Sequence, residues 1–197
     1  MKTTPLAALV ILCILVPPLP ALAQGGGGRG MSFARPDTPT EFDNADLGLR
    51  FVVPANLQLY TTEKPGRFRS VLAAGRFLYI VSPGMRRASV VAKASANMTE
   101  ADLEAYRAIL DANPPQAKLD GFKKHSLRTV KIGRHGEKDA LEFVYDAREN
   151  DVPVTIRQVV FVHNGQGFTF TCTSTQAEYG GAGQSVFDPV FSRLEFR

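Results

Sequence analysis

The chain has 197 residues, with 23 lysines and arginines against 19 aspartates and glutamates. Its formal net charge of +4 is only a mild excess, which argues against a nucleic-acid-binding protein, because such proteins concentrate basic residues on one surface. The chain contains only two cysteines, Cys13 and Cys172, which excludes a small scaffold held together by several disulfides.

Residues 1–23 have the organisation of a secretory signal peptide. Lys2 precedes the apolar segment Leu6–Val16, and the small residues Ala21 and Ala23 stand where signal peptidase requires them. The apolar segment is shorter than the roughly 20 residues that a helix needs to span a bilayer. We therefore predict cleavage after Ala23 and export to the periplasm or the extracellular space, with retention of the segment as an anchor as the alternative.

The remaining sequence divides by composition into two parts. Residues 24–40 are rich in glycine and proline and show no apolar period, so we expect a flexible tether. Residues 41–197 are expected to form a single domain, because a domain of this size can bury a core without disulfides. We expect membrane contact to be peripheral at most.

Strands are predicted where short runs of β-branched and aromatic residues are bounded by glycine, proline or asparagine. These runs occupy 47–54, 67–74, 76–82, 88–95, 125–132, 140–147, 152–163 and 168–174. In the run 140–147, apolar residues alternate with Glu142 and Asp146, so both acids are expected on a solvated face. Strand 152–163 instead has apolar residues on both faces, which indicates a sheet covered on both sides.

Two helical segments are predicted. Residues 99–112 can begin with a capping box at Thr99 and Asp102, and their apolar residues recur at helical spacing. Near the end of the chain, four apolar residues have the same spacing, with Pro189 in the first turn or at a bend: Phe187, Val190, Phe191 and Leu194. The order of strands, helix, strands and helix predicts an α+β fold with a mostly antiparallel sheet.

His163 and Cys172 are the residue types of a cysteine-dependent catalytic pair and lie close in sequence. Cys172 alternates in phase with Phe168 and Phe170, so it is predicted to be a core residue. A hairpin turn at 164–165 or at 165–166 would keep the thiol at least about 13 Å from the imidazole. The pair is therefore predicted to be non-catalytic. Because the sequence contains no metal-ligand spacing or phosphate-binding loop, we assign no catalytic residue, cofactor or metal.

The clearest charge asymmetry lies in residues 118–138, which carry seven basic and two acidic residues. A basic hairpin of this kind can dock an acidic protein surface or anionic headgroups. Lysines that protect exposed edge strands from aggregation produce the same pattern. The candidate protein-binding residues are Lys123, Lys124, Arg128, Lys131 and Arg134.

Five segments together resemble a known superfamily. They are "LGLRFVVPANLQL", "TEADLEAYRAIL", "VKIGRHGEKDALEFVYDA", "IRQVVFVHNGQGFTFTCTS" and the closing "FDPVFSRLEF". Their order resembles the PsbP-like superfamily, which includes photosystem PsbP proteins, DcrB-type envelope proteins and the Mog-type Ran-binding protein. The resemblance implies an α/β/α sandwich around an antiparallel sheet and a non-enzymatic accessory or adaptor role. No binding residues of the superfamily are carried over, because no binding motif is matched.

The sequence thus predicts an exported, non-catalytic adaptor that contacts another envelope protein or complex, and the basic hairpin favours an acidic one. The alternative is a carrier of a small apolar ligand or lipid between sheet and helix. Its cavity would be lined by residues such as Phe143, Tyr145, Phe168 and Phe170.

Overall fold

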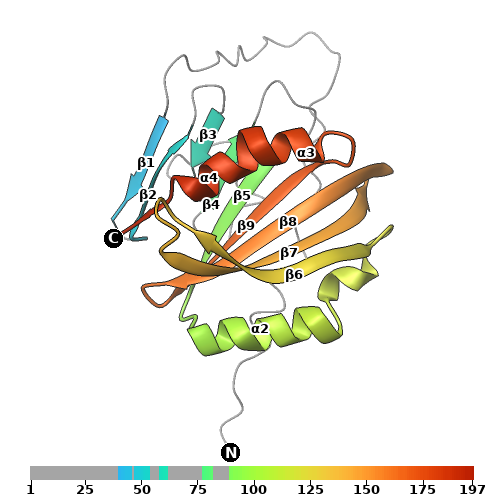
Figure 1. The fold of residues 1–197 in the computed structure, drawn as a ribbon, viewed down its shortest axis with the longest axis horizontal. Helices are drawn as coiled ribbons and strands as arrows, with labels where there is room; N and C mark the ends of the chain where they lie inside the picture. Colours follow the sequence, from blue (N-terminus) through green and yellow to red (C-terminus); the bar gives the residue numbers. More distant parts are fainter. Residues whose placement is uncertain (1–39, 46, 54–57, 62–76, 82–88) are drawn as a thin grey trace, which may run out of the picture.

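The structure is a computed structural model that describes residues 40–45, 47–53, 58–61, 77–81 and 89–197. The predicted signal peptide, residues 24–39 of the predicted tether and the predicted strand 67–74 lie outside these ranges. Within them, the chain forms two antiparallel sheets, and helical segments lie on both sides of the larger one (Figure 1). The predicted α+β class is confirmed.

The larger sheet has seven strands in the order β3-β4-β5-β9-β8-β7-β6, and every neighbouring pair is antiparallel. The strands are β3 (Gln58–Thr61), β4 (Phe77–Val81), β5 (Ser89–Ala96), β6 (Lys123–Ile132), β7 (Lys138–Glu149), β8 (Val152–His163) and β9 (Gln166–Thr175). Strand β6 is therefore an outer strand of this sheet.

The smaller sheet joins the two ends of the described chain. It consists of β1 (Thr40–Asn44), β2 (Leu49–Val53) and β10 (Glu195–Phe196), with β2 in the middle. Phe42 and Phe51 stack with ring centroids 4.9 Å apart, and Phe51 belongs to the buried core. Of the three strands, the sequence predicts only β2. Strand β1 directly follows the glycine- and proline-rich segment, and β10 has two residues and pairs with a segment far away in sequence.

Helix α2 (Glu100–Ala112) forms where the sequence predicts it. The Asp102 backbone N–H donates to Thr99 Oγ1, and the Thr99 N–H donates to the Asp102 carboxylate, which completes the capping box. The helix packs against β7 and β8 and buries Leu103, Tyr106 and Leu110, and a 3-10 turn, η2 (Pro115–Lys118), follows it.

The C-terminal helical segment lies on the opposite side of the larger sheet (Figure 1). It contains α3 (Tyr179–Ala182), one π-helical turn η3 (Gly183–Phe187) and α4 (Asp188–Ser192), with Pro189 in the first turn of α4. The four apolar residues that predict this segment are all buried, as expected: Phe187, Val190, Phe191 and Leu194.

Strand β8 is buried on both faces, as its sequence predicts. Val154, Ile156, Val160 and Val162 join the core beneath α2, and Val159 and Phe161 join the core beneath the C-terminal segment.

The same two cores correct the lining proposed for a ligand carrier. Phe143 and Tyr145 belong to the α2 side, whereas Phe168 and Phe170 belong to the other side of the sheet. Since a sheet separates the two pairs, these four side chains do not line one cavity.

Candidate functional site

The His163–Cys172 pair is not a catalytic pair in this fold. His163 lies opposite Gln166 across a two-residue turn, whose residues Asn164 and Gly165 both have positive φ, as a type I′ hairpin requires. Cys172 lies six residues further along β9, about 20 Å away at the rise of a strand. The thiol is fully buried, and burial raises its pKa far above the ordinary value, so it is held as a neutral core side chain.

Four of the five candidate binding residues lie on β6, and Arg134 lies in the turn that follows. The pairing of β6 with β7 contains an irregularity between Lys124 and Ser126, which places His125 at a bulge. Lysines and bulges are devices that protect an outer strand from uncontrolled pairing. The bulge adds to the protective features that the sequence already indicates.

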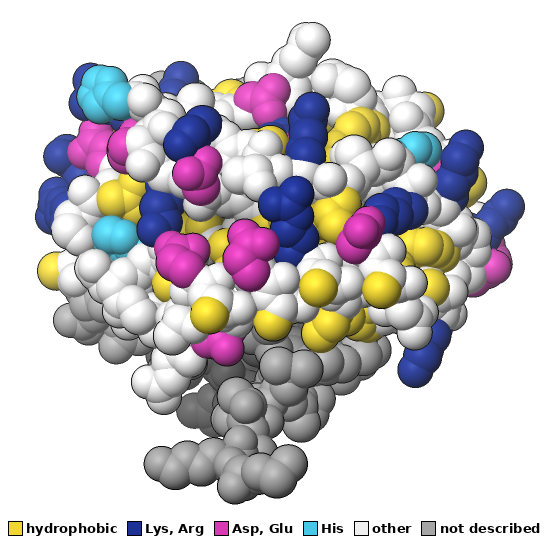
Figure 2. All heavy atoms as spheres, turned by 60° about the horizontal axis from the view of Figure 1, so that its bottom comes forward, with side chains coloured by type: hydrophobic (Ala, Val, Ile, Leu, Met, Phe, Trp, Pro, Cys, Tyr) yellow, Lys and Arg dark blue, Asp and Glu magenta, His cyan; other side chains and the backbone are white. Residues whose placement is uncertain are grey.

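Four of the five candidate cations have acidic partners within the chain. Lys124 pairs with Asp111 of α2 at 2.9 Å, and Lys131 pairs with Asp139 of β7 at 2.9 Å. Arg128 pairs with Glu142, and Arg134 pairs with Glu195. Lys123 is exposed and forms no ion pair with any residue that the structure describes. The hairpin's positive charge is therefore largely offset, and Figure 2 shows basic and acidic side chains interspersed on the side that carries α2.

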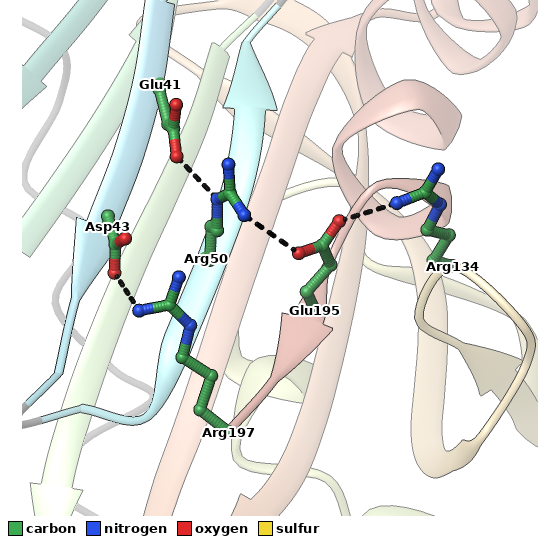
Figure 3. Close-up of polar contacts among 6 residues, drawn as sticks. All are labelled: Glu41, Asp43, Arg50, Arg134, Glu195 and Arg197. Carbon is green, nitrogen blue, oxygen red and sulfur yellow. Dashed lines mark hydrogen bonds and ion pairs between the residues drawn. The ribbon is translucent and has the colours of Figure 1, made fainter.

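Arg134 belongs to a chain of ion pairs that crosses the smaller sheet (Figure 3). Glu195 of β10 lies between two arginines, 3.0 Å from Arg134 and 3.6 Å from Arg50, and Arg50 also pairs with Glu41. The Arg134 N–H donates to the carbonyl of Leu194 at 2.8 Å. Arg134 thus ties the β6–β7 turn to the C-terminal strand.

Glu142 corrects the expectation of a solvated acid. Its side chain is only 1% exposed, and its two oxygens lie 2.6 Å from Nε of Arg128 and 2.6 Å from Nε of Arg157. Arg128 is the direct cross-strand partner of Glu142, and Arg157 reaches it from β8 on the other side. The Arg157 Nε contact is a charge pairing without hydrogen-bond alignment. A charged residue can be buried here because two guanidinium groups enclose it.

Arg157 connects this cluster to the C-terminal segment. Its Nη1 donates to Asp188 at 2.6 Å, and its guanidinium lies over the ring of Phe191 at 5.1 Å from the centroid. Burial tends to lower the pKa of Arg157, but the hydrogen bond to Asp188 and the charge of Glu142 raise it above the ordinary value. The guanidinium therefore remains charged and holds α4 to the sheet.

Arg128 differs from the other four candidate cations. Its side chain is 66% exposed although its Nε is held by a buried carboxylate. Its two terminal amino groups contact no acceptor among the residues that the structure describes. Arg128 is therefore an exposed cation with a fixed position and unused donors.

A second polar cluster lies at the beginning of β6. His125 Nε2 is 2.8 Å from the Asp146 carboxylate, which also accepts a hydrogen bond from Thr155 at 2.7 Å. Burial tends to raise the pKa of Asp146, but the hydrogen bonds from Thr155 and His125 lower it below the ordinary value. In the described ranges, no group of three histidine, cysteine or acidic side chains is placed to hold a metal ion. No described helix has the length and apolarity needed to cross a membrane.

Several solved structures are similar to the chain in fold. Cyanobacterial PsbP (CyanoP) from Synechocystis sp. PCC 6803 is similar with a TM-score of 0.56 and 14% identity, over 88% of this chain and 98% of that one. A protein from Bacteroides thetaiotaomicron VPI-5482 has a TM-score of 0.54 and 16% identity, over 81% of this chain and 49% of its own. The Ran-binding protein Mog1p of Saccharomyces cerevisiae has a TM-score of 0.48 and 8% identity, over 80% and 95%.

No protein-family model matches the chain, and no curated protein matches it in sequence. The likeness to solved structures is therefore one of fold, and identities of 14% and 16% carry no functional residues with them. The chain has a PsbP-like α+β fold, as the order of its sequence segments predicts.

Proposed function

We propose that the chain is an exported, non-catalytic adaptor that binds another envelope protein along strand β6. One observation carries the proposal: β6 is a ten-residue outer strand, exposed cations line it, and no described strand pairs with its outer edge. An outer strand offers unpaired backbone groups to an extended segment, a common mode of protein recognition. Lys123, which has no ion-pair partner among the described residues, and the terminal amino groups of Arg128 favour an acidic partner.

The non-catalytic part of the proposal is supported by the two residues best suited to chemistry. Cys172 is buried with a raised pKa, and His163 contacts the backbone oxygen of Arg197 at 3.0 Å and packs beside Phe196. Both side chains are engaged in the fold. Export is supported by the leader-like segment at residues 1–23.

The test compares capture of the natural partner by three forms of the chain in the cell that produces it. The edge variant Lys123→Glu/Lys131→Glu reverses two exposed charges on β6, both without a buried partner. The matched control Lys118→Glu/Arg193→Glu makes the same change in net charge outside β6, at the end of η2 and after α4. We expect the wild type and the control to recover the same protein and the edge variant to lose it.

High salt should weaken the same complex, because exposed charge contacts are screened within about 3 Å at 1 M ionic strength. Equal capture by the edge variant and the control would contradict binding at β6. The melting temperatures of both variants, measured beforehand, establish that each is folded.

A further inference from the structure

We propose that Arg128 is the recognition residue of this surface and that it receives one carboxylate of an acidic, extended segment laid along β6. The inference rests on the proposed function and deepens it, because it assigns the partner's chemistry and the residue that reads it.

Arg128 is held in place by a residue that cannot move away. Glu142 is buried in the sheet, and its second oxygen is engaged by Arg157, which is in turn fixed by Asp188. An exposed arginine ordinarily loses rotamer freedom when it binds a ligand, and that loss reduces affinity. For Arg128, much of this ordering is already present in the unbound protein.

The free donors of Arg128 suit a carboxylate. A guanidinium has five N–H donors, and only Nε–H is used by Glu142. The two terminal amino groups remain for a ligand, and a carboxylate can accept two parallel hydrogen bonds from them. Because Glu142 is already shared with Arg157, an incoming carboxylate would add to the cluster without leaving a buried charge unpaired.

The neighbouring lysines lack these properties. Lys124 and Lys131 direct their ammonium groups to Asp111 and Asp139, and Lys123 is not fixed by any described partner. An ammonium is also a strongly hydrated point charge without the fork that matches a carboxylate. These lysines can attract an acidic segment, whereas Arg128 can select for a carboxylate at one position.

The position of Arg128 also defines the segment. Successive side chains of a strand alternate between faces, so Arg128 shares the C-terminal-segment face with Ser126 and Val130, both half-buried. A segment that follows β6 would place an acid beside Arg128 and small or apolar side chains two residues to either side. The predicted partner motif is therefore an acid flanked at alternate positions by apolar residues.

The experiment titrates the purified full chain with a seven-residue peptide, blocked at both ends, in which a central glutamate has valine two residues to either side and threonine fills the other positions. A second peptide has glutamine in place of the glutamate. Backbone amide shifts report where each peptide binds and how tightly. Arg128→Lys keeps the charge and removes the fork, and Arg193→Lys is the matched control, the same exchange at an exposed arginine outside β6.

We expect the glutamate peptide to shift the amides of β6 and to bind Arg128→Lys about tenfold more weakly, since an ammonium cannot form the two parallel hydrogen bonds of the guanidinium fork. Arg193→Lys should bind it within about twofold of the wild type, and the glutamine peptide should bind far more weakly. Equal affinity for both peptides, equal binding by Arg128→Lys, or no shift at β6 would each overturn the inference.

The proposed function has a separate outcome. If Arg128→Lys captures the natural partner as well as the wild type does, while Lys123→Glu/Lys131→Glu does not, β6 is the binding surface but Arg128 is not its recognition residue. If the edge variant retains the partner, the proposed function itself fails.

Discussion

Two glutamates in this molecule have the same kind of partners and different surroundings. Glu142 and Glu195 each lie between two arginines, one at each carboxylate oxygen. Glu142 is 1% exposed with both contacts at 2.6 Å, whereas Glu195 is 35% exposed with contacts at 3.0 and 3.6 Å. The two sets of ion pairs are alike in composition, but only the Glu195 side chain is accessible to water.

The comparison shows that burial decides what such an arrangement does. An exposed ion pair contributes about 0–1 kcal/mol, because water and salt screen it. Loss of one partner from a buried pair costs about 3–5 kcal/mol, because a desolvated charge is left uncompensated. We therefore expect the Glu142 cluster to fix structure and the Glu195 cluster to contribute little stability.

The largest effect is expected for Glu142→Gln. The substitution keeps the shape of the side chain but leaves Arg157 without its main buried counter-charge, so the free energy of unfolding should fall by about 3–5 kcal/mol. Urea unfolding followed by circular dichroism measures this difference. A loss below about 1 kcal/mol would show that burial has not set the two glutamates apart.

A smaller loss is expected when both buried charges are removed. Glu142→Leu/Arg157→Met replaces the pair with apolar side chains, and such replacements of whole buried pairs are often neutral. The free energy of unfolding of the double variant should lie within about 2 kcal/mol of the wild-type value and well above that of Glu142→Leu alone. If the double variant is as unstable as the single one, the loss comes from packing and not from an unpaired charge.

Glu195→Gln should have a smaller effect still. Arg134 and Arg50 are exposed to solvent, and Arg50 keeps Glu41 as a partner, so we expect a loss below about 1 kcal/mol. The same urea series provides the measurement. A loss comparable to that of Glu142→Gln would contradict the expectation that the exposed ion pairs of Figure 3 contribute little stability.

The smallest effect is in the salt dependence. Raising sodium chloride from about 0.1 to about 1 M shortens the screening length from about 10 to about 3 Å. The stability difference between the wild type and Glu195→Gln should then vanish, whereas the difference for Glu142→Gln should persist. A parallel decline of both differences would indicate that Glu142 is accessible to solvent.

Much of the fold follows from local patterns in the sequence. The capping box at Thr99 and the burial of strand 152–163 on both faces are confirmed. The hairpin turn occupies residues 164–165, one of the two positions that the sequence allows. These features depend on residues close together in the chain. The sequence does not predict strands β1, β3 and β10. Strands β3 and β10 pair with segments outside their own neighbourhood in sequence, and β1 directly follows the glycine- and proline-rich segment.

The charged sites could not be predicted in the same way. Alternation places Glu142 on the face opposite Phe143, and the C-terminal segment that covers this face, with Asp188, lies 46 residues later in the sequence. One signal was available: Arg157 stands in the middle of a strand predicted to be buried on both faces, so it requires an acidic partner. Counting charge along 118–138 likewise omits the acids that α2, β7 and β10 contribute.

The most direct test of the adaptor proposal is photocrosslinking in the cell that produces the chain. A photoreactive phenylalanine derivative is placed at Lys123 or Lys131 on β6, and at Arg193 as the control position beyond α4. We predict that both β6 positions crosslink to one and the same envelope protein and that position 193 does not. Crosslinks from position 193 alone, or none from β6 while the partner is still captured, would contradict an adaptor that works through this strand.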